Sequence, residues 1–408
     1  MVINDYVVMS KSWATDADDY RRSELAERVA HVIDAVRRRG DEAVYEYATR
    51  SDGWVAADFR LSAREIDACI DQVSTAALEE MRFAQDQIAR FAEAQRAGLQ
   101  DVEIEALPGV RLGHRHIPLG SVGAYVHAGR ELPVAALTSV VAARVAGVER
   151  VAVCAPPRDG ALVASVVAAM RLAGVDEIYA LGGVHAVAAL TFGTESIPRV
   201  DLIIGSGDQL LVEAQRQLLG KVGIEVFVGP PEILVVADET ADPAQVAADL
   251  LAEAEHDPEA RAVLVTTSPA LAARMPDEIE RRLHALRRSA SAEAAWRRQG
   301  AIHLAASPDH VCAIADRHAF EHVEILTADP QWYLERLRNY GALFLGAGAA
   351  AAGGEAALGI NHTAPTGRTA RFSGGLSVGR FLKTVTTYDL RGTRDEEAGG
   401  VHALPSLP

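Results

Sequence analysis

The sequence predicts an α/β protein with two parallel-sheet domains, one inserted into the other. Residues 20–100 place apolar side chains at the three- and four-residue spacing of helices. Two similar segments, SVVAARVAGVERVAVCAPP from Ser139 and SVVAAMRLAGVDEIYALGG from Ser165, each have the pattern of an Ala/Val helix, a glycine turn and a short apolar strand. After residue 232, further apolar strands alternate with helices at a different spacing. Repeated helix–strand units are typical of parallel sheets.

The composition indicates a protein that binds neither nucleic acid nor membranes. The chain has 408 residues and a net charge of −16, whereas binding to phosphate backbones requires a basic surface. No apolar run approaches the roughly 18 residues of a membrane span, and the N-terminus lacks a secretory signal pattern. The cysteines, Cys69, Cys154 and Cys312, are odd in number and far apart, unlike a disulfide framework or a cysteine zinc site. These features predict a cytoplasmic protein.

The expected elements can be placed in order along the chain. A small segment covers residues 1–19, helices follow up to about residue 100, and a β-rich passage extends from about Val110 to Val126. The next strands are expected within the two repeated segments, at VDLIIG (200–205), and at EVFVG continuing into EILVVAD (225–238). The later strands are expected at RAVLVTTS, AIHLAAS, HVEILTAD and ALFLG.

These elements predict a division of the chain into domains. The first α/β domain is assembled from residues 20–118 and 232–374. The second α/β domain is inserted into it and covers residues 119–231. The short, charged and glycine-rich tail, residues 375–408, is expected to pack as a C-terminal arm.

Two glycine-rich turns are candidates for phosphate binding. The run from Gly346 to Ala351 formally matches G-x-G-x-x-A, but no acidic residue stands about 20 residues later, so a flexible loop is the preferred interpretation. Gly205-Ser-Gly207-Asp208 is a better candidate, because it follows a strand and opens a helix whose N–H groups attract anions. A tight strand-to-helix turn would need similar glycines, so both interpretations stay open.

Acidic residues and histidines form three candidate clusters. Glu253 and His256 are three apart at a helix end, so they project from one face and are able to ligate one metal; a solvated helix end is the alternative. Glu321 and His322 are an adjacent acid and base before a strand, and neighbours on an extended segment point in opposite directions. His362 lies in the polar, glycine-rich segment GINHTAPTGRTARFSGGLSV, whose composition suits a site loop.

These segments together resemble the histidinol dehydrogenase family from about residue 20 to Leu390. The most specific matches occur in chain order: VGAYV (122–126), GKVGIE (220–225), GPPEILVVADETADP (229–243), DLLAEAEHDPEARAVLVTTS (249–268), EHVEI (321–325) and NHTAPTGRTARFSGGLSV (361–378). The resemblance implies a homodimer with two incomplete Rossmann-like domains, a bound zinc ion and NAD. It also implies two successive hydride transfers that take an amino alcohol to the acid.

The resemblance assigns roles to individual residues. His256 falls on the family's zinc histidine, and His362 falls on its Asn-His pair, which we expect to contact substrate. Glu321 and His322 fall on its acid–base pair, with His322 taking the alcohol proton and Glu321 helping to activate water. Tyr125 matches a tyrosine beside the cofactor.

The sequence departs from the family pattern at the expected metal ligands. Glu253 stands where the family has Gln, and Glu355 stands where it has Asp. Both are carboxylates that zinc or a harder cation accepts, so a metal site is still expected. His402 and Glu397 are the candidates for the family's final zinc histidine and its nearby substrate-binding glutamate, although the tail is shorter than in the family.

Further departures fall on expected substrate and cofactor contacts. Pro231 replaces a substrate-binding serine and lacks a hydrogen-bond donor. His185 and Asp208 replace a glutamine and an asparagine on the cofactor side, and the sequence does not decide between NAD and NADP. Because the scaffold and the Glu321–His322 pair are retained, we predict a paralogue that oxidises another small polar alcohol, either an amino alcohol or an anionic diol. The alternatives are an authentic histidinol dehydrogenase and a non-catalytic binding protein.

Overall fold

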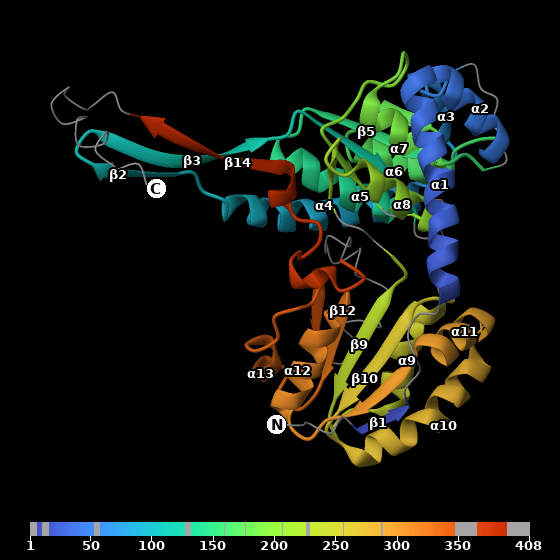
Figure 1. Cartoon of the computed structure of the whole chain (residues 1–408), viewed down its shortest axis with the longest axis vertical. Coiled ribbons are helices and arrows are strands. Elements are labelled where there is room, and N and C mark those ends of the chain that lie inside the picture. The colour runs from blue at the N-terminus through green and yellow to red at the C-terminus, as the bar shows by residue number, and fades with distance from the viewer. Residues whose placement is uncertain are drawn as a thin grey trace.

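The computed structural model of the chain consists of two lobes and a projecting arm (Figure 1). We call the elements α1–α8 and β4–β8 the upper lobe, the elements β1, β9–β13 and α9–α13 the lower lobe, and the strands β2, β3 and β14 the arm. The structure describes residues 6–9, 16–52, 58–126, 132–158, 160–175, 177–205, 207–225, 229–255, 257–286, 289–346 and 365–389. Within these ranges no helix is both long and apolar enough to cross a lipid bilayer.

A parallel sheet forms the centre of the upper lobe. Over the described residues it has five strands in the order β6-β5-β4-β7-β8. The strands are β4 (Ser121–Tyr125), β5 (Arg150–Ala155), β6 (Glu177–Ala180), β7 (Leu202–Ile204) and β8 (Gly223–Ile224). Helices α5 (Leu132–Ala146) and α6 (Ala164–Leu172) cover one face, while α7 (Gly183–Phe192) and α8 (Gln209–Leu218) belong to the opposite side.

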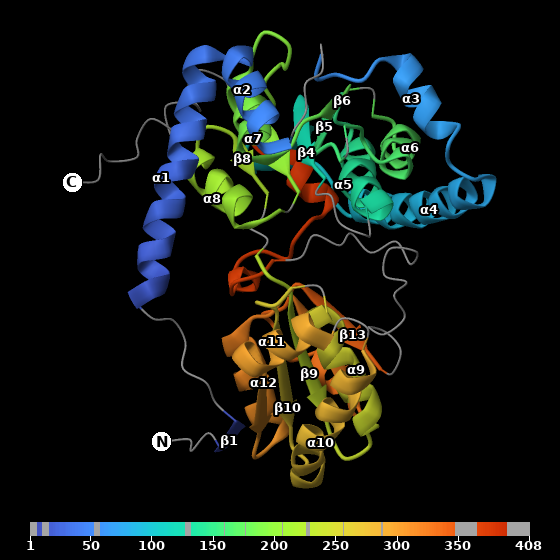
Figure 2. The same cartoon turned by 90° about the vertical axis from the view of Figure 1, so that its right-hand side faces the viewer.

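The four N-terminal helices also pack on the upper lobe, which differs from the predicted domain division. Helix α1 (Asp16–Arg39) contacts α7 and α8, and α2 (Asp41–Asp52) contacts α7. On the other face, α3 (Ala63–Ile70) contacts α6, and α4 (Thr75–Ala97) contacts α5. Figure 2 shows α1 lying along the side of the upper lobe. The helices of residues 20–100 were predicted from the sequence, but the sheet on which these helices pack was not.

A second sheet forms the lower lobe. In the part of the chain that the structure describes, its order is β1-β11-β10-β9-β12-β13, and every neighbouring pair is parallel except β1 with β11. The strands are β1 (Tyr6–Met9), β9 (Glu232–Ala237), β10 (Arg261–Thr266), β11 (Ala301–Leu304), β12 (His322–Leu326) and β13 (Ala342–Leu345). One face packs against α9 (Pro243–Ala252), α10 (Pro269–Ala285) and α11 (Ser289–Gln299), and the other against α12 (Pro308–His318) and α13 (Pro330–Leu334).

The two sheets confirm the predicted fold class of two parallel-sheet domains, with one difference at each end of the insertion. The N-terminal segment contributes β1 to the lower lobe, so the upper lobe is inserted between β1 and β9 of one sheet. The segment 225–238, expected as one continuous strand, is divided between the lobes. Its neighbour β8 ends at Ile224 in the upper sheet, and β9 begins at Glu232 in the lower sheet.

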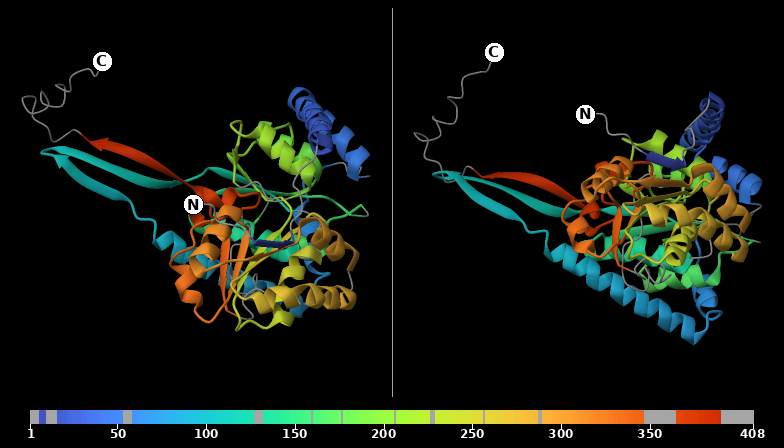
Figure 3. Two further views of the ribbon diagram at one scale, coloured as in Figure 1. Left: turned by 60° about the horizontal axis from the view of Figure 1, so that its bottom comes forward. Right: turned by 90° about the horizontal axis from the view of Figure 1, so that it is seen from below.

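The arm is an antiparallel ribbon that points away from both lobes (Figure 3). Strand β3 (Val110–Pro118) pairs with β2 (Val102–Leu107) on one side and with β14 (Leu382–Asp389) on the other. All six residues of β2 are exposed, including Val102, Ile104 and Leu107. The predicted C-terminal arm, residues 375–408, therefore supplies one strand of this ribbon, and its residues after Asp389 lie outside the described part.

Strand order reverses once in the upper sheet, between β4 and β7. From β4 the chain proceeds outwards through β5 to β6, and then returns to place β7 on the other side of β4. Gly205, which follows β7, makes this close approach possible because its φ is +109° and a Cβ there would lie 2.1 Å from the Tyr125 carbonyl oxygen. Ligands of open α/β sheets bind at the carboxyl ends of the strands beside such a reversal.

Replacing Gly205 with alanine is expected to destabilise the protein more than the same change at Gly220. Gly220 also has a positive φ, +87°, but a Cβ there would meet no atom within 4 Å. Gly220→Ala should therefore cost only the backbone strain, roughly 1–2 kcal/mol of unfolding free energy. Gly205→Ala adds a collision with Tyr125. Urea denaturation of both variants measures the difference, and equal losses would show that the close contact is unimportant.

Candidate active site

The predicted acid–base pair lies at the amino edge of the lower sheet. Glu321 immediately precedes β12, and His322 is the first residue of that strand. Both are buried, with 7% and 4% of their surface exposed. Strand β12 lies between β9 and β13, and His322 is in register with Ile233 on β9 and with Ala342 on β13. Central parallel strands are buried on both faces, which fixes the position of the pair.

The imidazole of His322 lies between two carboxylates. Its Nδ1 is 3.6 Å from Oε1 of Glu253, and its Nε2 is 4.0 Å from Oε1 of Glu321. The ring of Phe344 on β13 meets the imidazole edge-on, with the ring centroids 5.6 Å apart. The expectation that Glu321 and His322 point in opposite directions is wrong, because Glu321 precedes the strand and does not follow its alternation. A base placed in this way is able to accept a proton while both carboxylates stabilise the resulting imidazolium.

Glu232 holds Glu321 through a reciprocal pair of hydrogen bonds. The N–H of Glu232 donates to Oε2 of Glu321 over 3.3 Å, and the N–H of Glu321 donates to the Glu232 carboxylate. Arg261 also donates to Glu232, with Nη1 2.9 Å from Oε1. Burial raises the pKa of Glu232, and the bonds from Arg261 oppose that shift. The neighbouring central strands β9 and β12 therefore begin with two glutamates, and the carboxylate of each accepts a hydrogen bond from the backbone N–H of the other.

The Glu232 carboxylate also holds the loop that contains Gly367 against the site. The N–H of Gly367 donates to Glu232, and the N–H of Gly229 donates to Oγ1 of Thr366 over 2.5 Å. Pro231, the predicted substrate contact, lies between Gly229 and Glu232 and is therefore beside Glu321. The loop that follows the predicted His362 is thus brought to the acid–base pair. His362 itself lies outside the described residues.

Sequence reasoning did not identify Glu232, Arg261 or Thr366 as site residues. A signal for Glu232 was present, because a carboxylate directly before an entirely apolar strand needs a partner when the strand is buried. Arg261 occupies the matching first position of β10 and is in register with Glu232. That pairing follows from strand order, which the sequence pattern did not determine.

Glu253 is the member of the predicted metal set that the structure describes. Helix α9 ends at Ala252, and Glu253 opens a short 3-10 turn, Glu253–Glu255, so its carboxylate reaches His322 from the helix end. Its side chain is 24% exposed. A carboxylate beside an imidazole suits zinc, and a helix C-terminus favours a nearby cation. The other predicted ligands, His256, Glu355 and His402, lie outside the described residues, as does Glu397; within the described ranges no group of three or more potential ligands occurs.

The predicted cofactor contacts surround the strand-order reversal of the upper sheet. Tyr125 ends β4, and its Oη accepts a hydrogen bond from the N–H of Gly183, 3.0 Å away, at the start of α7. Asp208 caps α8 by accepting from the N–H of Leu211, also over 3.0 Å, and its side chain is exposed. Two helix N-termini and a glycine turn at this edge suit a dinucleotide phosphate group.

His185 is buried, whereas the side chain of a cofactor contact would be expected to be exposed. It is 2% exposed within α7, and its ring stacks on Tyr47 of α2 with centroids 6.2 Å apart. Its proximity to the Tyr125 region comes through Gly183, where a Cβ would lie 3.4 Å from the His185 ring. In this structure His185 supports the start of α7 from within, and a direct contact with the cofactor stays a prediction.

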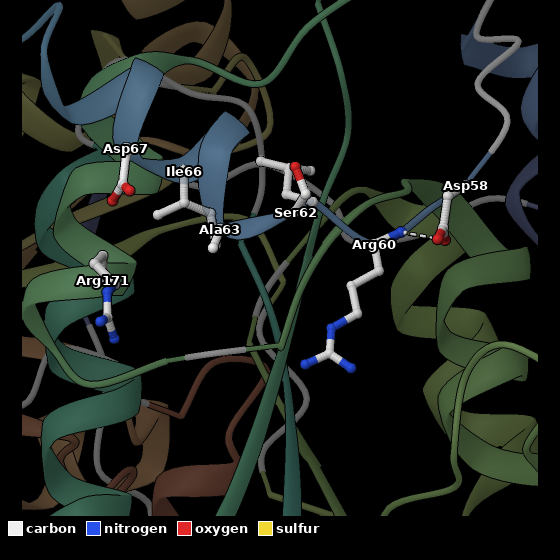
Figure 4. Close-up of a pocket in the computed structure, with 8 residues that line it drawn as sticks. Asp58, Arg60, Ser62, Ala63, Ile66, Asp67 and Arg171 are labelled. Atoms are coloured by element: carbon white, nitrogen blue, oxygen red, sulfur yellow. Dashed lines mark hydrogen bonds between the residues drawn. The ribbon is translucent and has the colours of Figure 1, made fainter.

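A surface pocket lies elsewhere, at the edge of the upper sheet (Figure 4). It is lined by residues before and within α3 and by one residue of α6, including Asp58, Arg60, Ser62, Asp67 and Arg171. Arg60 forms an isolated antiparallel β-bridge with Tyr179 of β6, the outermost strand on that side. None of the predicted site residues lines this pocket, so the pocket is separate from the candidate active site.

Comparison with known proteins gives a consistent assignment. The family model described as histidinol dehydrogenase matches residues 16–402. A protein of Shouchella clausii named "Histidinol dehydrogenase homolog" is 45% identical over 382 residues, covering 93% of this chain and 90% of its own. "Sulfopropanediol 3-dehydrogenase" of Ruegeria pomeroyi is 39% identical over 377 residues, covering 91% of this chain and 86% of its own.

A solved structure shares the fold. The histidinol dehydrogenase of Elizabethkingia anophelis superimposes with a TM-score of 0.86 at 29% sequence identity, over 96% of this chain and 88% of that one. It therefore has the same arrangement of two sheets as this chain. The chain belongs to the histidinol dehydrogenase family and is a dehydrogenase acting on a CH–OH group.

Proposed function

We propose that this protein oxidises a small polar alcohol other than histidinol, with His322 as the base that removes the hydroxyl proton. The placement of the His322 imidazole between Glu253 and Glu321 supports this assignment, because the two carboxylates stabilise the protonated ring. Glu321 would then accept a proton from the water that hydrates the aldehyde product. Its carboxylate is oriented for this by the N–H of Glu232.

The cofactors follow from the family and from the two edges described above. NAD would lie at the carboxyl edge of the upper sheet, beside Tyr125, His185 and Asp208, with NADP as the alternative. Zinc would be held by Glu253 with His256, Glu355 and His402. When bound, NAD supplies the hydride acceptor and zinc supplies a Lewis acid that orients the alcohol oxygen.

An anionic substrate is favoured by the residues around Pro231. The proline removes a donor from the substrate side of the site, and the exposed residue Arg368 directly follows Gly367, whose N–H is bonded to Glu232. A guanidinium recognises a sulfonate or carboxylate better than it tolerates a protonated amine. His362 and Glu397 are the remaining proposed substrate contacts.

Replacing His322 with glutamine is expected to reduce kcat by roughly 10²–10⁴-fold, the usual contribution of a general base. NADH formation with the best alcohol measures the effect. His284→Gln is a matched control, because His284 is a strongly exposed histidine of α10 and lies far from β12 in the sequence. Unchanged turnover by His322→Gln would contradict the proposed base.

The substrate class can be tested with purified protein supplied with zinc and NAD. We expect faster NADH formation with a sulfonated or carboxylated diol than with L-histidinol, because the guanidinium of Arg368 favours an anion. Faster turnover of L-histidinol would identify an authentic histidinol dehydrogenase instead. If no alcohol is turned over and NAD produces no thermal shift, the chain is a binding protein on the same scaffold.

We also propose that two copies form a homodimer through the arm. Val102, Ile104 and Leu107 on β2 are about half exposed, and Tyr388 on β14 is more so. A projecting ribbon with an unpaired edge and exposed apolar side chains gains stability when it is covered.

The double variant Ile104→Asp/Leu107→Asp is expected to be monomeric, because it places two charges on the proposed interface. Light scattering after gel filtration measures the mass. Leu334→Asp, which changes an exposed leucine of α13 in the lower lobe, should leave the dimer intact. A dimeric double variant, or a monomeric parent protein, would rule out the arm as the interface.

A further inference from the structure

Two fully buried carboxyl groups lie behind the contact between Glu253 and His322. Asp249, on α9, and Glu324, on β12, are 1% and 0% exposed. The two carboxyl groups are in contact with each other, and Asp249 also lies beside Gln245. Neither carboxyl group takes part in the proposed chemistry. We call Asp249 and Glu324 the inner pair, and Glu253 and His322 the outer pair.

The two pairs connect the same helix to the same strand. From Asp249 on α9 to Glu253 just after the end of that helix, the chain advances four residues, which is roughly 6 Å. From Glu324 back to His322 it moves two residues along β12, which is roughly 6.6 Å, and both side chains project from the same face of the strand. The two spacings match, so both pairs are able to form in one position of α9 along β12.

The contact between these two buried carboxyl groups favours a shared proton. Two ionised carboxylates in contact repel each other, and burying both charges would be very costly. Burial raises the pKa of Asp249, while the neighbouring Glu324 and Gln245 side chains and the charge of Arg282 on α10 oppose the shift. The neighbouring strands β9 and β10 present apolar side chains to α9, including Val235 and Leu264. The other titratable groups on α9 and β12 at this face are those of the outer pair.

We propose that Asp249 and Glu324 share one proton and thereby fix α9 on β12 in the register that places Glu253 against the Nδ1 of His322. Both are positioning residues, since they act through the outer pair. The role of the outer pair rests on the proposed function, whereas the shared proton does not. A helix shifted along the strand would separate Glu253 from His322, and a displacement of about 1 Å at an active site costs up to about a hundredfold in rate.

The shared proton is tested first, without substrate. Infrared spectroscopy of the wild-type protein at neutral pH should show a protonated carboxyl band that is lost in the double amide variant Asp249→Asn/Glu324→Gln. In the wild-type protein, unfolding free energy should also fall as the pH rises above about 4, the ordinary pKa of a carboxyl group, because the native pair retains its proton. The double amide variant should lack that contribution to the slope. If the band is absent from the wild-type protein, the proposal is wrong.

The positioning role is tested by kinetics. Asp249→Ala leaves Glu324 without its partner and should lower kcat about tenfold or more while leaving KM for NAD unchanged. The double amide variant keeps a hydrogen bond between the two side chains and should restore most of the turnover. Glu278→Ala, which removes a buried carboxylate of α10 paired with Arg281, controls for the general effect of losing such a group.

Each kinetic outcome has a distinct meaning. If Asp249→Ala loses no more turnover than Glu278→Ala, or if the double amide variant is as slow as Asp249→Ala, the inner pair does not set the register. If Asp249→Ala fails to fold, the double amide variant and the infrared band still decide. An active His322→Gln variant would overturn the proposed base but would leave the carboxyl band unchanged, so the two hypotheses fail separately.

Discussion

The parallel pairing of β9 with β12 is the interaction on which the candidate active site depends. It aligns His322 with Ile233, so Glu321 and Glu232 meet at the start of the two strands, where the N–H of each donates to the carboxylate of the other. The helix that follows β9 then brings Glu253 to the His322 ring. Because both strands are buried on both faces, a slip of one residue would turn His322 away from Glu253. The site is therefore assembled by the sheet at its amino edge, opposite to the edge at which α/β proteins commonly bind ligands.

Much of the fold was predictable because apolar runs and helical spacing are local properties. The strands at VERVAVCAPP, RAVLVTTS and HVEILTAD were placed correctly from such runs. The sheet covered by residues 20–97 was not, because an amphipathic helix shows that one face is buried but does not name its partner. The single strand expected over 225–238 failed for a related reason: Gly229-Pro230-Pro231 marks a break in the apolar run, but it does not show that the chain leaves one sheet for another there.

The candidate site was predictable only in part. The Glu321–His322 pair and Glu253 come together as candidates from different segments, but the direction of Glu321 was mispredicted, because strand alternation does not apply to a residue outside the strand. The buried position of His185 depends on Tyr47, which is distant in sequence. Glu232 and the inner pair also have partners that are distant in sequence. Their contacts can be identified only when the positions of β9, β12 and α9 are known. His256, Glu355, His362, Glu397 and His402 stay predictions.

The antiparallel pairing of β1 with β11 has a consequence for the order of folding during synthesis. The upper lobe, with its four N-terminal helices, is interrupted by β2 and β3 of the arm but precedes most of the lower lobe, so most of it can fold while the rest is still being made. Strand β1 emerges before the upper lobe, but its partner β11 is made long after it. Synthesis therefore provides most of the upper lobe before the partner of β1 exists. Leu376, Val378 and Phe381 complete the core of that lobe late, and closing the lower sheet around β1 is also among the last steps of folding.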